Sequence, residues 1–217
     1  MRMPRNAALA LAAAALLAPR PALPQATVGI RAFGGYNTHA MGDLDDIMRG
    51  LYVPPDSYSN PKDGYSLGVG AELAWSQSLS FTASYERVVP GRMSEVNGQK
   101  MKLPANVFLL EAEYRWRLRP RFRAGVGGGG GYYQLGEEVE SPGTSRDYEG
   151  EAPGSQAFAL GEWDVTPAAS IGLAVGYRWA LVGVDKVNRQ PPKFAIDVDY
   201  SGLITRIVLR YVPKRTR

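Results

Sequence analysis

Eight segments of this 217-residue chain alternate apolar and polar residues, and the connections between them are alternately long and short. A period of two is typical of β-strands, because successive side chains point to opposite faces of a sheet. The short connections are tight turns around Gln77, Pro120 and Pro167, which are typical of hairpins. The pattern predicts eight antiparallel strands over residues 27–38, 64–76, 79–88, 106–118, 122–135, 155–165, 170–182 and 201–212.

The first 26 residues have the layout of a secretory signal peptide. Basic residues in MRMPRN precede a short Ala/Leu-rich run, and prolines follow. The run is too short to cross a bilayer as a helix, and the prolines would break a continuing soluble helix. We therefore expect a signal peptide at 1–26, a β-domain at 27–212 and a basic periplasmic tail at 213–217.

Charge and cysteine content exclude several functions. The formal charge of +4 falls to +1 when the three arginines of the predicted signal peptide are removed. No clustered basic face remains to neutralise phosphates, so nucleic acid is not an expected partner. The chain has no Cys, which excludes a disulfide scaffold, a thiol nucleophile and a Cys-based zinc site. We expect no cofactor, no metal site and no catalytic residue.

Charged residues indicate which face of the strands points inward. All six lysines fall in predicted loops or the tail, whereas the polar strand faces carry Gly, Ser and Ala together with Arg and Glu. Small residues and compensating charges suit a narrow interior, because a buried charge needs a hydrogen-bonded partner. The predicted lumen charge network comprises Arg31, Glu72, Glu86, Glu111, Glu113, Arg115, Arg117, Arg123, Arg178, Arg206 and Arg210.

The opposite strand faces carry aromatic residues near the strand ends. Such rings form the interfacial girdles of barrels in lipid. The alternative is a soluble lipocalin-like barrel, in which the apolar face would line a ligand cavity. The aromatic residues near the strand ends are Tyr65, Trp75, Tyr85, Tyr114, Trp116, Tyr177 and Trp179. We therefore predict an all-β, eight-stranded antiparallel up-and-down transmembrane β-barrel.

The last predicted strand, SGLITRIVLRYV, has Gly202 near its start, Leu203, Ile207 and Leu209 on one face, and Tyr211 near its end. It resembles the closing strand of outer-membrane β-barrels, which their assembly machinery recognises as an insertion signal. The mature chain as a whole resembles the small outer-membrane β-barrel superfamily that includes the OmpA transmembrane domain, the OmpX type and the opacity proteins. That resemblance implies a location in the outer membrane, with the lipid bilayer and the assembly machinery as partners. We expect this strand to pair with residues 27–38.

The C-terminus departs from the pattern of that superfamily. The chain does not end on the aromatic residue but continues through Pro213 into a basic tail. Proline cannot continue a ladder of backbone hydrogen bonds, so we expect the strand to stop there.

Three other features have a functional and a structural interpretation. His39 stands near Asp43, Asp45 and Asp46, which could hold a cation or activate water, or could belong to a loop and a short helix at 42–52 that Asp43 caps. The acidic loop from Glu137 to Glu151 could bind divalent cations or lipopolysaccharide, or could simply be solvated.

The third feature is the run Gly127–Gly131. It superficially suggests a phosphate loop, but it lacks the Lys-Ser/Thr pair of such loops. We expect the glycines to let the wall bend or to make room for long interior Arg side chains.

These observations leave four hypotheses about function. The leading hypothesis is a non-enzymatic barrel with a structural or surface-interaction role and a lumen plugged by side chains, because an eight-stranded barrel is just wide enough for side chains to fill. The alternatives are a narrow channel for small or apolar solutes, an outer-membrane lipid-modifying enzyme that uses His39, and a soluble lipocalin-like ligand-binding barrel.

Overall fold

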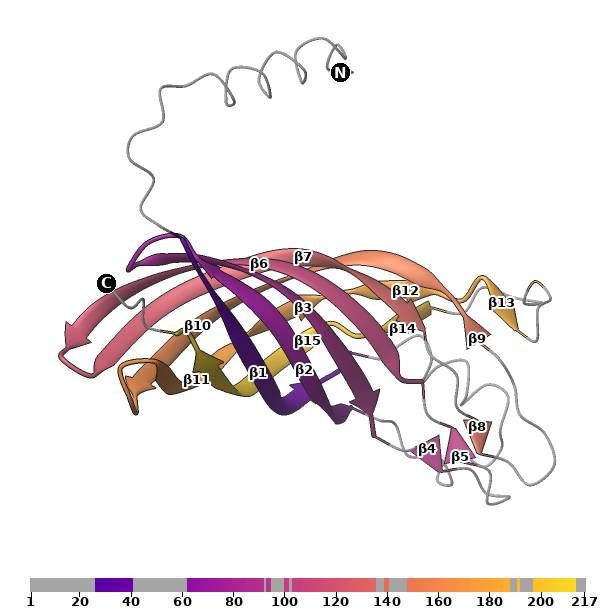
Figure 1. The fold of residues 1–217 in the computed structure, drawn as a ribbon. Coiled ribbons are helices and arrows are strands. Elements are labelled where there is room, and N and C mark those ends of the chain that lie inside the picture. The colour runs from indigo at the N-terminus through magenta and orange to yellow at the C-terminus, as the bar shows by residue number, and fades with distance from the viewer. Residues whose placement is uncertain are drawn as a thin grey trace, which may run out of the picture.

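The computed structural model describes residues 26–40, 62–91, 93–94, 100–101, 103–135, 139–140, 148–187, 191 and 197–213. Eight antiparallel strands close into a barrel in the order β1-β15-β11-β10-β7-β6-β3-β2, as Figure 1 shows. Each barrel strand therefore pairs with the barrel strands before and after it in the chain, which confirms the predicted up-and-down topology. The barrel strands are β1 (Thr27–Thr38), β2 (Asp63–Ala74), β3 (Leu79–Pro90), β6 (Ala105–Arg119), β7 (Phe122–Leu135), β10 (Glu151–Asp164), β11 (Ala169–Trp179) and β15 (Gly202–Tyr211).

The three predicted tight turns join β2 to β3, β6 to β7 and β10 to β11. Two of them use a hydroxyl in the same way. The Ser76 Oγ accepts hydrogen bonds from the backbone N–H groups of Ser78 and Leu79, at 3.2 and 2.9 Å. The Thr166 Oγ1 accepts from those of Ala168 and Ala169, again at 3.2 and 2.9 Å. These turns satisfy backbone groups locally, as short hairpin turns require.

The first and last strands close the barrel, as the sequence predicted. Residues Ile30 to Asn37 of β1 pair with β15 in antiparallel register. Gly202 begins β15, and a Cβ atom at this position would lie only 2.2 Å from the carbonyl oxygen of Thr38. The approach is tightened by a hydrogen bond of 2.8 Å from the Leu203 N–H to the Thr38 Oγ1. Closure leaves neither strand with an unpaired edge.

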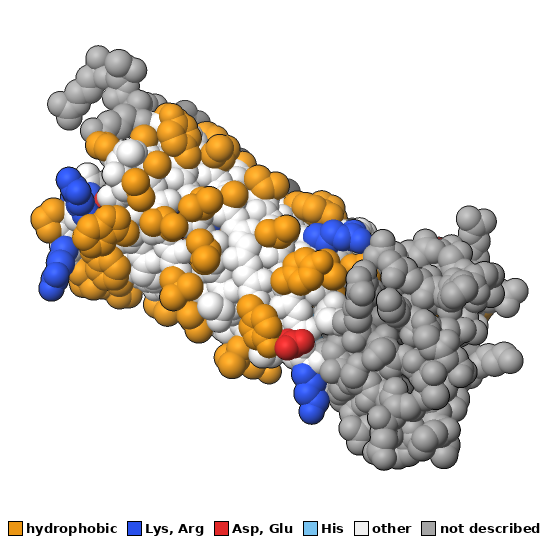
Figure 2. Space-filling model, turned by 90° about the horizontal axis from the view of Figure 1, so that it is seen from below, with side chains coloured by type: hydrophobic (Ala, Val, Ile, Leu, Met, Phe, Trp, Pro, Cys, Tyr) orange, Lys and Arg blue, Asp and Glu red, His pale blue; other side chains and the backbone are white. Residues whose placement is uncertain are grey.

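Side chains alternate between an apolar exterior and a polar interior. The aromatic residues predicted to lie outside are all exposed, from 37% for Tyr177 to 58% for Tyr65. Figure 2 shows apolar side chains spread over the barrel wall, with charged groups confined to its two ends on this face. Because the charged face points inward and the apolar face outward, the soluble lipocalin-like alternative is wrong. The exterior suits a lipid bilayer.

Towards the long loops, the chain adds small sheets to the barrel. They are formed by β4 (Met93–Ser94), β5 (Lys100–Met101) and β8 (Val139–Glu140), by β9 (Tyr148–Glu149) with β13 (Lys186–Val187), and by β12 (Leu181–Gly183) with β14 (Asp197–Asp199). β10 begins at Glu151, within the stretch predicted to be a loop, because residues 151–154 pair with β7. Residues 1–25 of the predicted signal peptide, the predicted helix at 42–52 and the tail residues 214–217 lie outside the described residues.

The glycine run in β7 brings neighbouring strands and side chains close. Gly127 pairs directly with Phe158 of β10, whose ring would lie 2.6 Å from a Cβ atom at position 127. Gly68 of β2 is paired in the same way with Phe33 of β1, whose ring would lie 2.3 Å away. Each glycine therefore gives an inward-pointing phenylalanine its place against the wall, which is an established role of glycine in curved sheets.

We expect Gly127→Ala to destabilise the barrel by about 1–3 kcal/mol, because the added methyl group would have to displace the Phe158 ring. The matched control is Gly130→Ala on the same strand, where a Cβ atom would meet only the Gly154 carbonyl at 3.5 Å. This control should change stability by less than about 0.5 kcal/mol. Urea unfolding in lipid vesicles measures both, and equal effects of the two substitutions would contradict this role of Gly127.

Candidate functional site: the charged lumen

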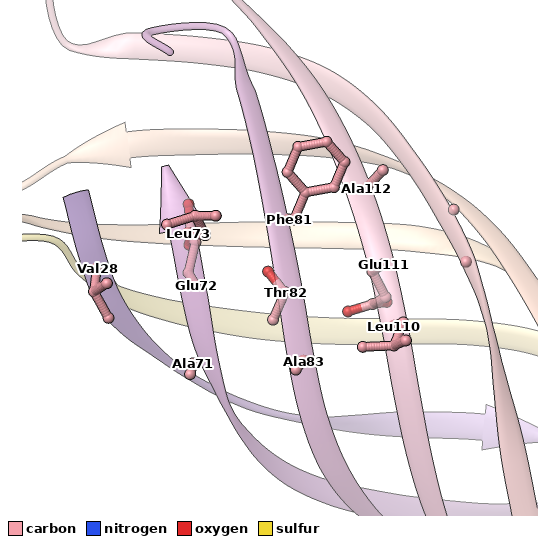
Figure 3. Close-up of a pocket in the computed structure, with 12 residues that line it drawn as sticks. Val28, Ala71, Glu72, Leu73, Phe81, Thr82, Ala83, Leu110, Glu111 and Ala112 are labelled. Atoms are coloured by element: carbon pink, nitrogen blue, oxygen red, sulfur yellow. The ribbon is translucent and has the colours of Figure 1, made fainter. Parts of the chain in front are cut away.

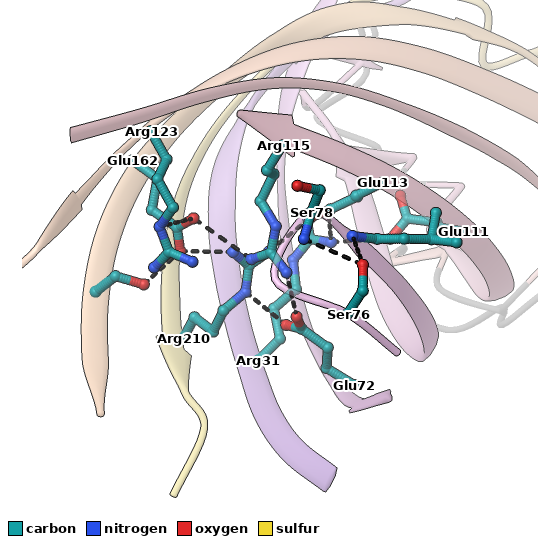
Figure 4. Close-up of polar contacts among 12 residues, drawn as sticks. Arg31, Glu72, Ser76, Ser78, Glu111, Glu113, Arg115, Arg123, Glu162 and Arg210 are labelled. Atoms are coloured by element: carbon teal, nitrogen blue, oxygen red, sulfur yellow. Dashed lines mark hydrogen bonds and ion pairs between the residues drawn. The ribbon is translucent and has the colours of Figure 1, made fainter. Parts of the chain in front are cut away.

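The lumen near the short turns is filled by a layer of buried Arg and Glu side chains (Figure 4). Arg210 of β15 lies at its centre. Its guanidinium donates from Nε to Glu72, from Nη1 to Glu162 and from Nη2 to Glu113, each at 2.5 Å. All three glutamates are at most 3% exposed. One arginine thus joins β15 to three other strands through charge-assisted hydrogen bonds, which are stronger than neutral ones.

Two further arginines complete this layer. Arg115 of β6 donates to Glu72 at 3.0 Å and to Glu162 at 3.4 Å. Arg31 of β1 donates to Glu113, and to Glu111 at 3.4 Å. The Glu111 carboxylate also accepts a hydrogen bond from the Gln156 side-chain amide, at 2.5 Å. Glu111 therefore links this layer to the part of the lumen nearer the long loops.

That second layer is built around Glu86 of β3. Its carboxylate accepts hydrogen bonds from Arg178 at 2.6 Å and from Arg206 at 2.8 and 3.0 Å. Arg206 also donates to the Gln156 Oε1 at 2.9 Å and lies 3.8 Å from Glu111. The network is therefore continuous along the lumen.

Three aromatic rings lie against the arginines of the two layers. The Phe33 ring contacts the guanidinium groups of Arg31 and Arg206, with ring-to-carbon distances of 5.5 and 4.8 Å. Phe158 contacts Arg31 at 5.8 Å, and Tyr133 contacts Arg178 at 5.6 Å. Arginine faces stack favourably on aromatic rings. The rings of Phe33 and Phe158 therefore fill the space between the layers, and Tyr133 holds the Arg178 guanidinium from the side of the long loops.

Above the charged layers, towards the long loops, the interior is apolar. A cluster of buried side chains from three barrel strands, β3, β6 and β7, packs against residues of the outer loops. The Tyr200 hydroxyl donates a 2.6 Å hydrogen bond to the Leu103 carbonyl within this cluster. The strand pattern of the sequence did not predict this apolar cluster. Its members include Val88, Leu103, Val107, Leu109, Tyr133, Val182, Val184, Val198 and Tyr200.

The structure places most of the predicted network residues inside the lumen, and it differs from the prediction at the short-turn end of the β6–β7 hairpin. Nine of them are at most 4% exposed. Arg123 stands at the mouth, where its side chain is 21% exposed and pairs with Asp164. The prediction for Arg117 was wrong. Arg117 pairs in regular register with Arg123, but it lies at the end of the barrel just before a bulge, where it is exposed and outside the buried network. The nine predicted residues that lie buried in the lumen are Arg31, Glu72, Glu86, Glu111, Glu113, Arg115, Arg178, Arg206 and Arg210.

Glu162 and Gln156, both on β10, are network residues that the sequence analysis missed. Glu162 binds Arg115, Arg210 and the hydroxyl of Ser170. With Glu162 included, five arginines and five glutamates lie buried in the described lumen. Arg123 and Asp164 add one more charge of each sign at the mouth. The interior charge is therefore balanced, as burial in a low-dielectric space requires.

His39 lies just beyond β1 at the end of the barrel near the long loops. It is 5% exposed, its ring meets the Tyr200 ring edge-on at 5.8 Å, and neither ring nitrogen has a hydrogen-bond partner among the described residues. Burial, reinforced by the positive charge of Arg178, lowers the pKa of His39 from 6.5 to about 4. Asp43, Asp45 and Asp46 lie outside the described residues. Within the described part, no group of three or more His, Cys, Asp or Glu residues could hold a metal.

A groove of about 600 Å³ lies on the outside of the wall (Figure 3). Alanines at positions 71, 83 and 112 form its floor, and Val28, Phe81 and Leu110 border it. Glu72, Thr82 and Glu111, which alternate with these residues, are buried and point into the lumen. The groove therefore faces lipid and does not open into the charged lumen.

The closed strand order, the apolar exterior and the charged lumen together define an outer-membrane β-barrel, and they place the chain in that membrane. No protein-family model matches the chain, and no curated protein matches it in sequence. Solved structures do match it. Neisserial surface protein A has a TM-score of 0.55 and 15% identity, over 86% of this chain and 98% of that chain. OprG from Pseudomonas aeruginosa has a TM-score of 0.57 and 14% identity, over 87% of this chain and 98% of that chain. At these identities the likeness shows a shared fold.

We expect Glu86→Gln to lower the free energy of unfolding by about 3–5 kcal/mol, because it leaves two buried arginines without their carboxylate. The matched control is Asp164→Asn, which also removes one acidic charge but from a partly exposed pair. Its cost should stay below about 1 kcal/mol. Urea unfolding of the reconstituted barrel compares the two, and a Glu86→Gln barrel as stable as the control would refute the importance of this pairing.

The depressed pKa of His39 predicts a loss of stability in acid. In the unfolded chain His39 takes up a proton below pH 6.5, whereas in the folded chain it does so only below about pH 4. The free energy of unfolding therefore falls as the pH drops from 6.5 to about 4. The loss should amount to roughly 3 kcal/mol at most. Unfolding at pH 7.5 and pH 4.5 measures it, and His39→Gln should remove this component. An NMR titration of His39 with an ordinary pKa would contradict the assignment.

Proposed function

We propose that the protein is a non-enzymatic outer-membrane barrel with a lumen plugged by side chains and a structural or surface-interaction role. The observation that supports this proposal most directly is the filled interior. Two linked layers of paired Arg and Glu, joined by Phe33 and Phe158, occupy the barrel, and an apolar cluster follows at its outer end. An eight-stranded barrel is only wide enough for side chains, so these layers leave little room for a water-filled path.

His39 also supports a role without catalysis. A general base needs a pKa close to the working pH and access to its substrate. The pKa of His39 is lowered to about 4, and its ring is buried against Tyr200. The ring therefore serves as a packing element at the outer end of the barrel and not as the centre of a lipid-modifying site.

The outer end supports an interaction role. Beyond the apolar band, the chain forms the β9–β13 and β12–β14 sheets, and the apolar cluster anchors β12 and β14 to the barrel strands. The barrel thereby presents ordered structure outside the membrane. Lipopolysaccharide and divalent cations are the partners that we propose for the acidic loops at this end.

The assembly machinery is a second proposed partner, through β15. Its outward side chains are more than 50% exposed at Leu203, Ile207 and Leu209, and Tyr211, which is 50% exposed, closes the series. Gly202 sits where no side chain would fit against Thr38. The last strand therefore has the alternating apolar face and terminal aromatic residue that we propose as the insertion signal.

Single-channel recording in planar lipid bilayers tests the plugged lumen. We expect the reconstituted protein to give no stable conductance steps, because the paired charges and the apolar cluster together obstruct ion passage. A wide porin incorporated into the same membranes provides the positive control, and heat-modifiable migration on a denaturing gel shows that the added protein is folded. Reproducible openings from the folded protein would contradict the proposal and favour a narrow channel for small or apolar solutes.

A further inference from the structure

The hairpin of β6 and β7 ends in a cluster of exposed arginines. Arg117 and Arg119 lie at the end of β6, and Arg121 follows in the turn. Arg117 pairs with Arg123 at the mouth of the lumen, whereas Arg119 follows the bulge and pairs with Phe122, so both arginines stand at the rim of the barrel. All three side chains are exposed, and none of them makes a hydrogen bond or ion pair with a described residue.

Within the described part of the chain, no acidic group pairs with this cluster. Among the described residues at the short-turn end, the acidic residue outside the buried lumen layer is Asp164, and it is engaged by Arg123. The described residues at the opposite end carry an excess of the opposite charge. Its described side chains near the long loops include six acidic and three basic residues, namely Asp63, Glu149, Glu151, Asp185, Asp197, Asp199, Lys62, Arg87 and Lys186. The three hairpin arginines therefore give the short-turn end a local positive charge that the described residues of the other end do not share.

The neighbours of the cluster set its depth relative to a bilayer. Trp116 and Leu118, on the same strand, are 40% and 56% exposed, and Trp163, which pairs with Phe122 beside Arg121, is 50% exposed. Tryptophan prefers the boundary between hydrocarbon and headgroups. Figure 2 shows Lys or Arg groups directly beside the apolar side chains at the end away from the grey loops. The arginines therefore lie at headgroup level.

We propose that Arg117, Arg119 and Arg121 form a binding surface for the anionic phospholipid headgroups of the leaflet that faces the short turns. Guanidinium groups bind phosphate oxygens with charge-assisted, often bidentate hydrogen bonds. A basic residue at an anionic membrane surface favours binding about fivefold. The hairpin anchors this end of the barrel to phosphatidylglycerol-type lipids, independently of whether the lumen conducts.

Tryptophan quenching by brominated lipids tests the proposal. The chain has four Trp residues, of which Trp75, Trp116 and Trp163 lie towards the short turns. A Trp179→Phe background restricts the emission to these three. The folded barrel is placed in phosphatidylcholine bilayers with increasing shares of brominated phosphatidylglycerol or brominated phosphatidylcholine. We expect phosphatidylglycerol to bind at least about fivefold more tightly, and we expect high salt to weaken the preference.

Variants then assign the preference to the hairpin. The triple variant Arg117→Gln, Arg119→Gln, Arg121→Gln should bind both lipids equally, whereas the corresponding triple Lys variant should keep most of the preference. The matched control removes the same charge from the other end by Lys62→Gln, Arg87→Gln and Lys186→Gln, and should behave as the natural protein does. Heat-modifiable migration verifies that each variant is folded.

Three outcomes would overturn the proposal. The natural protein could bind the two lipids equally, the triple Gln variant could keep the full preference, or millimolar glycerol phosphate in solution could abolish the preference. The last result would show a site for a soluble phosphate and not a lipid-binding surface.

Discussion

A charge that is buried in a narrow barrel has to meet an opposite charge, and the interior of this protein is arranged around that constraint. Arg210 alone contacts three glutamates, and Glu86 holds Arg178 and Arg206 together. These bonds connect strands that are far apart around the barrel wall, such as β15 with β3 and β6. The pairing therefore fixes the register and the filling of the lumen at once. Removing one partner leaves a buried charge, which costs several kcal/mol.

The glycines and aromatic residues follow from the same constraint. The arginine side chains need the space around them in the lumen to be filled by other side chains. Those side chains in turn need room against the barrel wall. Gly68 and Gly127 leave room for Phe33 and Phe158, and these rings lie against the guanidinium groups of the network. Towards the outer loops the interior changes from charged to apolar. The proposed non-conducting role depends on the two charged layers and the apolar cluster. The β12–β14 sheet outside the membrane packs on the apolar cluster.

Much of this fold could be predicted from the sequence, because a barrel wall repeats one simple rule along each strand. Alternation gave the eight strands, the tight turns, the closure by β15 and the inward direction of nine network charges. It failed at Arg117, which lies so close to the end of the barrel that it is exposed, and it missed Glu162, which lies in the less regular strand β10. It also missed the apolar cluster. Leu103 and Tyr200 come from loops outside the predicted strands, so their meeting inside the barrel depends on tertiary contacts that no single segment displays.

The central claim is that one face of each strand points into a filled, charged lumen and the other into lipid. Because the natural chain has no Cys, single cysteines report this directly. In lipid vesicles, a water-soluble maleimide should label Gln77→Cys in a short turn but neither Ser84→Cys in the lumen nor Leu110→Cys on the wall. A lipid-soluble maleimide should add Leu110→Cys and still spare Ser84→Cys. Labelling of Ser84→Cys from water as fast as Gln77→Cys would contradict the account.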